Sequence, residues 1–177
     1  MWANQKQTGF TIVELLIVIV VIGILAAITI VAYNGVQDRA KISKRDTDLS
    51  QIEKAIQLAR VNTGNTTVGI TGTGMSTFGC IVAGGNTSGA EPRTLPKTNA
   101  CWTQYYNFLT TIGNASGMNL SSLRDGDSSG NPYYINENEG ESNGGNYCTA
   151  DQIGYFTGSG VAFIITKNIA ASKGTSC

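Results

Sequence analysis

Residues 9–33 read GFTIVELLIVIVVIGILAAITIVAY, the longest apolar segment of the chain. From Leu15 to Ala32 it contains no charged residue and only one hydroxyl group, that of Thr29. An apolar run of about 18 residues or more is long enough to cross the hydrocarbon layer of a membrane as a helix. The sequence therefore predicts a membrane-spanning helix near the N-terminus.

One carboxylate, Glu14, stands at the front edge of this run, where a charged group is costly unless it has a partner. The run itself contains no cation, and the short polar flank before it ends in the small residue Gly9. If the chain is cut after Gly9, Phe10 acquires a free amine that is cationic near neutral pH. Phe10 and Glu14 are then four residues apart on one helix face, so the amine can pair with the carboxylate of its own chain or of a neighbour.

The segment Gly9 to Leu15, GFTIVEL, with the apolar run behind it, resembles the class III leader and N-terminal helix of type IV prepilins and pseudopilins. The resemblance implies that a prepilin peptidase cuts between Gly9 and Phe10 and methylates the new amine. It also implies that Glu14 aligns incoming subunits by pairing with that amine on a neighbour. Many relatives carry a proline where this chain has Val31. The alternative interpretation is a plain signal anchor in which Glu14 is incidental.

Four segments follow from the resemblance and from the pattern of apolar residues. We expect a cleaved leader at residues 1–9, a transmembrane or filament-core half of a long helix at 10–33, an amphipathic half at 34–62 and an extracellular globular head at 63–177. Apolar residues recur at helical spacing in the second half, at Val36, Ala40, Leu49, Ile52, Ile56 and Ala59. Gly64 suits a left-handed cap at the end of this helix.

The head is expected to be of the α+β class and pilin-like. Thr98 and Asn99 can cap a helix that runs to about Ile112 and that buries an aromatic face. Strands are predicted at residues 133–138, in part of 147–156 and at 161–167, with a shorter strand or extended piece at 78–83. Together the strands would form a small antiparallel sheet that covers Leu49, Ile52 and Ile56 of the long helix.

Composition argues against two function classes. The chain contains no histidine, which removes the commonest general base and the commonest metal ligand. Its formal net charge is zero, so no global field favours nucleic acid. The glycine-rich residues 69–74 lack the spacing of a phosphate-binding loop. We therefore expect neither an enzyme nor a nucleic-acid site.

The four cysteines permit three disulfide pairings. We favour Cys80–Cys101 and Cys148–Cys177, because each pair closes a local loop. The second pair would resemble the C-terminal disulfide loop of many pilins. The alternative is a set of reduced, buried thiols.

A loop rich in oxygen ligands, residues 125–131, is a candidate calcium site, and calcium is the only cofactor that we consider. Asp125, Asp127 and Ser129 match alternate positions of a calcium-binding loop, and Asn131 follows them. The segment from Gly130 to Tyr133 also resembles the turn before the head strands of major pseudopilins. The alternative is an Asp/Gly/Ser turn that leads into a strand.

The resemblance and the positive-inside rule disagree about orientation. Lys6 precedes the run, whereas Arg39, Lys41, Lys44 and Arg45 follow it, which by itself would place the leader outside. The resemblance implies the opposite, a leader inside and a head outside, and four cysteines suit an oxidising exterior. The charged residues from Asp38 to Asp48 form either a subunit-contact stripe or a solvated face.

The function that these expectations favour is that of a type IV pilus subunit, which serves adhesion, twitching motility or DNA uptake. Its partners would be further copies of the chain in a helical filament, the prepilin peptidase, the assembly platform with its ATPase, and the membrane before assembly. The alternatives are a pseudopilin of a type II secretion-like piston, a minor pilin, or a membrane-anchored enzyme or binding protein.

Overall fold

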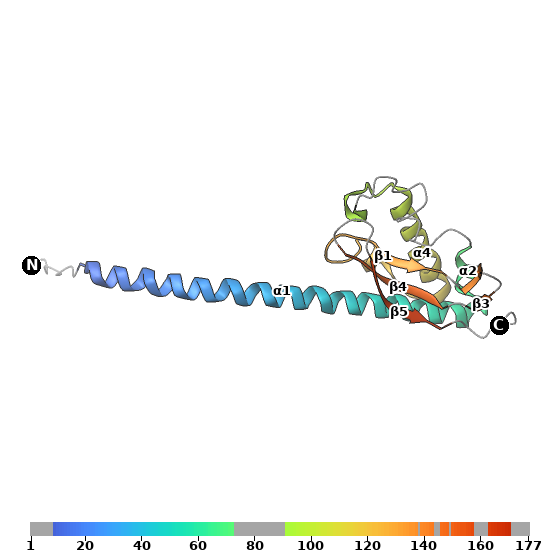
Figure 1. Ribbon diagram of the computed structural model, residues 1–177, viewed down its shortest axis with the longest axis horizontal. Helices are drawn as coiled ribbons and strands as arrows, with labels where there is room; N and C mark the ends of the chain where they lie inside the picture. Colours follow the sequence, from blue (N-terminus) through green and yellow to red (C-terminus); the bar gives the residue numbers. More distant parts are fainter. Residues whose placement is uncertain are drawn as a thin grey trace, which may run out of the picture. The chain divides into compact units, whose positions relative to one another are not determined.

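The computed structural model describes residues 9–72, 91–137, 139–143, 146–148, 150–157 and 163–170. Its elements, labelled where there is room in Figure 1, are α1 (Ile12–Thr63), α2 (Thr67–Thr71), η1 (Pro92–Thr94), α4 (Ala100–Ser116), η2 (Ser121–Leu123), β1 (Tyr133–Asn136), β2 (Glu139–Asn143), β3 (Asn146–Cys148), β4 (Asp151–Phe156) and β5 (Phe163–Ile169). The chain forms two compact units, Met1–Ile42 and Ser43–Cys177. The long helix and the antiparallel sheet confirm the expected α+β, pilin-like fold.

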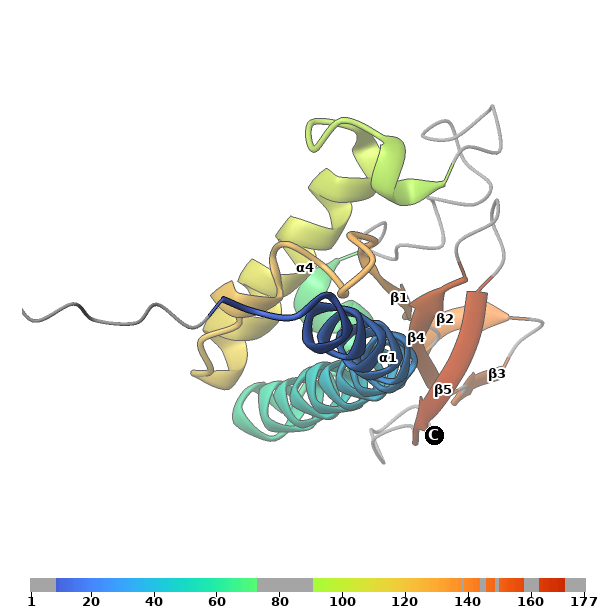
Figure 2. The ribbon, with the colours of Figure 1, turned by 90° about the vertical axis from the view of Figure 1, so that its left-hand side faces the viewer.

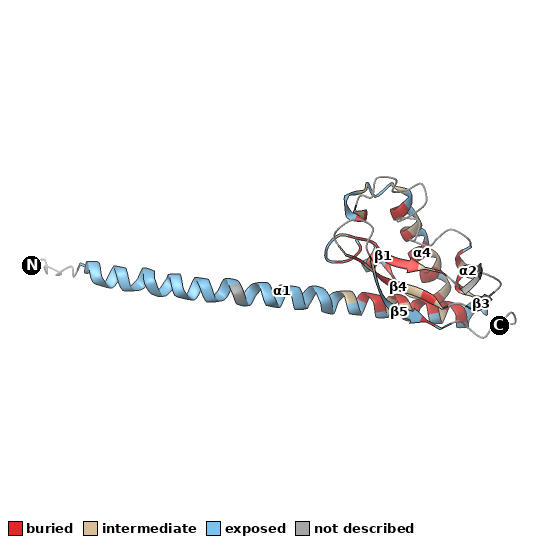
Figure 3. Cartoon of the chain, in the orientation of Figure 1, coloured by how far each residue is buried: buried red, intermediate tan, exposed pale blue. Residues whose placement is uncertain are grey.

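In the first unit the described residues from Ile12 onward all belong to α1, and they are exposed at every position whose side chain is described (Figure 3). The helix begins at Ile12, two residues later than predicted, and the glycines at positions 23 and 35 do not interrupt it. No proline lies within residues 12–63, so every backbone N–H beyond the first turn can donate to a carbonyl four residues earlier.

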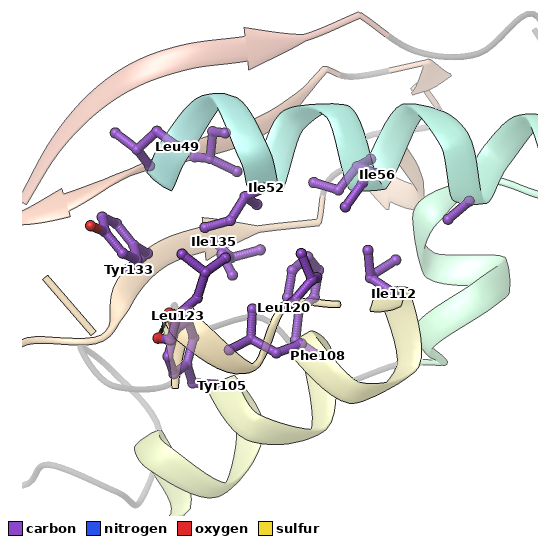
Figure 4. Close-up of a cluster of buried hydrophobic side chains, with 14 of the residues drawn as sticks. Leu49, Ile52, Ile56, Tyr105, Phe108, Ile112, Leu120, Leu123, Tyr133 and Ile135 are labelled. Carbon is purple, nitrogen blue, oxygen red and sulfur yellow. Dashed lines mark hydrogen bonds between the residues drawn. The ribbon is translucent and has the colours of Figure 1, made fainter. Parts of the chain in front are cut away.

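The second unit has a hydrophobic core built on the remainder of α1. Leu49, Ile52 and Ile56 are fully buried there, as predicted. Figure 4 shows Ile52 and Ile56 on the side of α1 that faces Phe108 and Ile112 of α4. The same cluster includes Leu120, Leu123, Tyr133, Ile135, Ile153 and Ile169. The core is therefore covered by α4 and by the sheet together.

The ends of α1 and α4 follow the capping residues that the sequence offered. Gly64 adopts φ +69° and its N–H donates to the carbonyl oxygen of Arg60 at 2.8 Å. The side chain of Asn99 accepts a hydrogen bond from the backbone N–H of Cys101, so α4 begins at Ala100. α4 continues one turn beyond the predicted end at Ile112 and stops at Gly117, which has φ +72°.

Three antiparallel strands form the main sheet in the order β1-β4-β5, and they lie side by side in Figure 2. β2 and β3 form a separate two-stranded sheet. The predicted stretch 147–156 therefore contributes to two different sheets. The predicted strand at 78–83 lies outside the described residues, and the short helix α2 was not anticipated.

A register shift marks the pairing of β4 with β5. Ile153 pairs with Lys167 and Gly154 pairs with Ile165, so Thr166 is the extra residue of a β-bulge. At this point a Cβ atom added to Gly154 would lie 1.9 Å from the carbonyl oxygen of Ile164. Only glycine fits at position 154 without a shift of the backbone.

A buried arginine joins four elements of the head. Arg60 of α1 donates from Nη2 to Oδ2 of Asp151 on β4 at 2.8 Å and from Nη1 to the carbonyl oxygen of Ala170, just after β5, at 2.7 Å. Its Nε donates to Oγ1 of Thr67 on α2 at 3.0 Å. Because a guanidinium group presents several donors in a fixed plane, one side chain fixes the last turns of α1 against α2 and the sheet.

Replacing Gly154 by alanine should destabilise the head by about 1–3 kcal/mol, the usual cost of forcing extra volume into a packed site. Thermal unfolding of the full chain in detergent, followed by near-UV circular dichroism, measures this change. Gly35→Ala is the matched control, because nothing lies within 4 Å of a Cβ atom at that helical position. Equal melting temperatures for the two variants would contradict the close approach.

Alkaline titration should report on two buried tyrosines. Burial, with Asp48 as a further cause, raises the pKa of Tyr133 and of Tyr105 above the ordinary value of 10.0. The Tyr133 hydroxyl donates to Oδ2 of Asp48 at 2.6 Å, and the Tyr105 hydroxyl donates to the carbonyl oxygen of Leu123 at 2.7 Å.

A raised pKa in the folded state contributes stability that is present below the unfolded pKa and is lost as the pH rises above it. We therefore expect these two tyrosines to ionise only as the head unfolds, above about pH 10. Tyrosinate absorbance and circular dichroism are recorded in the same titration. The part of the absorbance change that is missing in Tyr105→Phe and in Tyr133→Phe belongs to these two residues, and it should coincide with the loss of circular dichroism. Ionisation of both residues near pH 10 in a head with native circular dichroism would contradict this expectation.

Candidate functional site

The first turn of α1 is held by a reciprocal pair of side chains. The backbone N–H and the hydroxyl of Thr11 both donate to Oε2 of Glu14, at 2.8 Å and 2.7 Å. In return, the backbone N–H of Glu14 approaches Oγ1 of Thr11 at 3.3 Å. This is the arrangement of a capping box, in which the residue before the helix and the third helical residue satisfy donors that the first turn leaves open.

The capping box gives Glu14 a role that our sequence analysis missed. The pattern Thr-x-x-Glu before an apolar run, Thr11 to Glu14, is itself a signature of this motif and could have revealed it. Oε2 is the oxygen engaged by Thr11, and within the described residues Oε1 accepts no hydrogen bond. One oxygen therefore orients the carboxylate and the other is available to an incoming cation.

The predicted processing residues lie just outside the helix. Gly9, Phe10 and Thr11 precede the first helical residue, Ile12. Phe10 is 87% exposed, and nothing lies within 4 Å of a Cβ atom at Gly9. The peptide bond between Gly9 and Phe10 thus stands on accessible, non-helical backbone beside the oriented carboxylate, although no contact between Phe10 and Glu14 is seen within this part of the chain.

The apolar run that follows is uncovered by its own chain. Its large apolar side chains from Ile12 to Ile30 are exposed to between 48% for Val21 and 87% for Ile12. Within the described residues, α1 is the one helix that is long and apolar enough to cross a membrane, judged by length and composition. Such a surface requires lipid or other protein to cover it.

The single hydroxyl of the run is satisfied inside its own helix. Oγ1 of Thr29 donates to the carbonyl oxygens of Leu25 and Ala26, both at 2.9 Å. A polar group without a partner would be costly in hydrocarbon. Thr29 is therefore compatible with a lipid-facing helix.

Some of the charged residues that follow the apolar run are engaged by contacts within the chain. Lys44, Arg45 and Asp48 contact the head or each other: Lys44 Nζ lies 2.5 Å from Asp48 Oδ2, and Arg45 Nη2 lies 3.8 Å from Asp127 Oδ2. The guanidinium of Arg45 also stacks on the ring of Tyr155, 3.7 Å from its centroid. Part of the predicted contact stripe from Asp38 to Asp48 is thus turned inward and is occupied by its own chain.

The predicted calcium loop is folded as a turn. Oδ1 of Asp127 accepts hydrogen bonds from the backbone N–H groups of Ser129 and Asn131, at 2.8 Å and 2.9 Å. Oδ1 of Asn131 accepts one from the backbone N–H of Arg93 at 2.9 Å. Asp127 and Asn131 are buried, whereas Asp125 and Ser129 are exposed.

Among the described residues, no group of three or more His, Cys, Asp or Glu side chains is placed to hold a metal ion. The cation nearest to the buried carboxylate of Asp127 is the guanidinium of Arg45, which opposes a second positive charge there. Calcium binding stays a prediction from the sequence, and nothing proposed below depends on it.

The disulfide predictions are only partly accessible. Cys101, at the start of α4, is buried and disulfide-bonded. The side chains of Cys80, Cys148 and Cys177 lie outside the described residues. The pairings Cys80–Cys101 and Cys148–Cys177 therefore stay predictions.

Comparison with known proteins agrees with the geometry of the N-terminal segment. Residues 4–30 match the family described as the prokaryotic N-terminal methylation motif. The chain is 34% identical over 62 residues to the type II secretion system core protein G of Escherichia coli K12. These residues are 35% of this chain and 43% of the relative. It is 45% identical over 58 residues to a fimbrial protein of Moraxella nonliquefaciens, covering 33% and 38%.

A third relative is the type IV major fimbrial protein FimA of Dichelobacter nodosus, which is 41% identical over 54 residues, covering 30% of this chain and 35% of the relative. The chain thus matches less than half the length of each of these relatives. No solved structure matches it.

The N-terminal segment of the chain is thus similar to that of a type II secretion system core protein and of fimbrial proteins.

Thr11→Val tests the capping box. The substitution removes the hydroxyl that donates to Glu14 and that accepts from its N–H, and loss of such a cap typically costs about 1 kcal/mol. Amide hydrogen exchange of residues 12–15 in detergent micelles should become about fivefold faster, the ratio that corresponds to that free energy. Thr11→Ser, which keeps the hydroxyl, is the control and should exchange as the unmodified chain does. Unchanged protection in Thr11→Val would show that the cap does not hold the first turn.

Proposed function

We propose that the chain is a prepilin that is cut between Gly9 and Phe10 and then polymerises through its N-terminal helix as the structural subunit of a type IV pilus. The observation that carries the proposal is the coexistence of two features in one turn of helix. The apolar helix that begins at Ile12 has exposed side chains. Glu14, near its start, is oriented by hydrogen bonds from Thr11 to one carboxylate oxygen, and the other oxygen accepts no hydrogen bond from a described residue.

The two features have complementary roles in this proposal. Before assembly the apolar half of α1 lies in the membrane, which satisfies its side chains. In the filament the apolar halves of neighbouring copies cover each other, since no other apolar surroundings exist outside the lipid. The change from lipid to protein is nearly neutral for apolar side chains, so a polar contact is needed to select the position of each incoming copy.

Glu14 supplies that polar contact. The cut after Gly9 creates a cationic amine at Phe10, and Oε1 of Glu14 on a neighbouring copy is free to accept it. An ion pair in apolar surroundings is strong, and either partner left alone there is costly. The pairing therefore favours copies that are in register over copies that are displaced.

The remaining assignments follow from the family. The leader, residues 1–9, would stay inside the cell and the head, residues 63–177, would face outside. Residues 10–33 would cross the membrane before assembly, with residues 34–62 supporting the head. The prepilin peptidase, the assembly platform and its ATPase would act on the chain before it reaches the cell surface, where the filament would serve adhesion, twitching motility or DNA uptake.

Glu14→Ala tests the role of the carboxylate. The chain should still be cut before Phe10 and should accumulate in the membrane, because its apolar run is unchanged. The yield of filaments sheared from cells should fall by about tenfold or more, because an unpaired amine in apolar surroundings costs at least ~1.4 kcal/mol, which corresponds to that ratio. Quantitative immunoblotting of sheared and membrane fractions measures both effects.

Asp38→Ala provides a matched control, because it also removes one exposed carboxylate from α1. Its filament yield should stay close to that of the unmodified chain. Normal filament yield from Glu14→Ala would rule out the proposed pairing.

Mass spectrometry of the sheared material tests the processing step and the location. The mature chain should begin at Phe10 and carry a methyl group on its amine. A mature chain that still begins at Met1 would overturn the proposal. Filaments found only within the cell envelope would instead identify a secretion pseudopilin.

A further inference from the structure

Five of the seven charged residues of α1 in the head unit form ion pairs within their own chain. Four ion pairs account for them: Lys44 with Asp48, Arg45 with Asp127, Glu53 with Lys167, and Arg60 with Asp151. Two charged residues of this part of α1 are in none of these pairs, and they are Asp46 and Lys54. Both are exposed, and neither has an ion pair with any described residue.

The two residues carry opposite charges and belong to one exposed surface. We call this surface the α1 strip, made of Asp46, Thr47, Ser50, Lys54 and Gln57, all of which are exposed. At 100° per residue, eight positions separate Asp46 and Lys54 by about 80° around the helix and by about 12 Å along it. Asp46 and Lys54 therefore stand near opposite edges of the strip and at different heights.

Between these two charges the side chains of the strip are short and held by their own chain. The hydroxyl of Thr47 donates to the carbonyl oxygen of Ser43, and the hydroxyl of Ser50 donates to that of Asp46, both at 2.8 Å. Oγ of Ser50 also accepts a hydrogen bond from Nζ of Lys167 on β5 at 3.2 Å, which leaves Asp46 and Lys54 as the charges of the strip that are open to a neighbouring surface. A salt bridge formed at such a contact loses more water than one that stands alone on a surface, and it is correspondingly stronger.

From these observations we propose that the α1 strip is a contact between copies of this chain, in which Lys54 of one copy pairs with Asp46 of the next. The proposal rests on the proposed function, because membrane insertion of every copy by the same N-terminal run makes all copies parallel. Parallel copies bring Lys54 beside Asp46 when they are displaced by about 12 Å along the helix.

Such a contact does not close on itself. Asp46 of the first copy and Lys54 of the second remain free for further copies, since the two charges lie on different edges of the strip. A head-to-tail contact of this kind produces an open polymer, whereas a two-fold contact produces a dimer. The pair thus fixes the displacement between neighbouring copies in the head region. Glu14 fixes it separately at the start of the helix.

Charge reversal tests the pair in cells in which the unmodified chain forms filaments. Asp46→Lys and Lys54→Asp should each reduce the sheared filament yield by about tenfold, because like charges then meet at every contact between copies. The double variant Asp46→Lys/Lys54→Asp should recover most of the yield, because it restores opposite charges. Since both residues are exposed, thermal unfolding of the head should be the same for all three variants.

Cysteine cross-linking tests the geometry of the contact. The double variant Asp46→Cys/Lys54→Cys should give, on mild oxidation of filaments, a ladder of covalent dimers, trimers and longer products. Thr47→Cys/Gln57→Cys is the matched control on the same strip; its two positions have the wrong offset for this displacement and should give no ladder. Each single cysteine variant should stay monomeric.

The outcomes separate the two proposals. No filaments from the unmodified chain would overturn the proposed function and this contact with it. Normal filaments from both single charge reversals would overturn the contact alone. A cross-linked product that stops at the dimer would also overturn it, because it indicates a closed two-fold pair.

Discussion

The apolar side chains on the first half of α1 are exposed among the residues that the structure describes, and their need for cover is the constraint on which the other features of this protein depend. The described residues of the first unit offer no second element against which the helix could pack. Lipid or copies of the same chain must supply the cover, since water does not tolerate so large an apolar surface. The chain is thus complete only within a membrane or an assembly, and its few polar groups there acquire unusual importance. Thr29 is satisfied by its own helix, whereas Glu14 keeps one oxygen for a partner.

The second half of α1 meets the opposite situation. Leu49, Ile52 and Ile56 are sealed by α4 and the sheet, and Arg60 bonds to three other parts of the head. One helix therefore has two kinds of surface, one satisfied within the chain and one left for other molecules. The head therefore has a hydrophobic core of its own, whereas the described part of the N-terminal run has none. In this half most charged residues are paired within the chain, so the unpaired ones are the charges that can bind another molecule.

Much of this arrangement could be predicted from residue patterns. The apolar run, the capping residues Asn99 and Gly64, and the buried face of α1 were predicted within about one helical turn, because each depends on local propensity or on helical period. The role of Thr11 was missed although its signature is local. The division of residues 147–156 between two sheets could not be foreseen, because strand pairing depends on partners distant in sequence. The same holds for the bulge at Thr166 and for the glycine that it requires at position 154.

The residue pattern alone requires a long helix, a first half that is apolar on every side and a single acid at its start. These features depend only on neighbouring residues. The contacts between distant segments, in contrast, set which charges of α1 are paired within the chain and which stay unpaired. Lys54 and Arg60 are six positions apart and look alike in the sequence, yet Arg60 is buried against Asp151 and Lys54 faces outward. That difference arises from the path of β4, which brings a residue 91 positions away to Arg60 and brings none to Lys54.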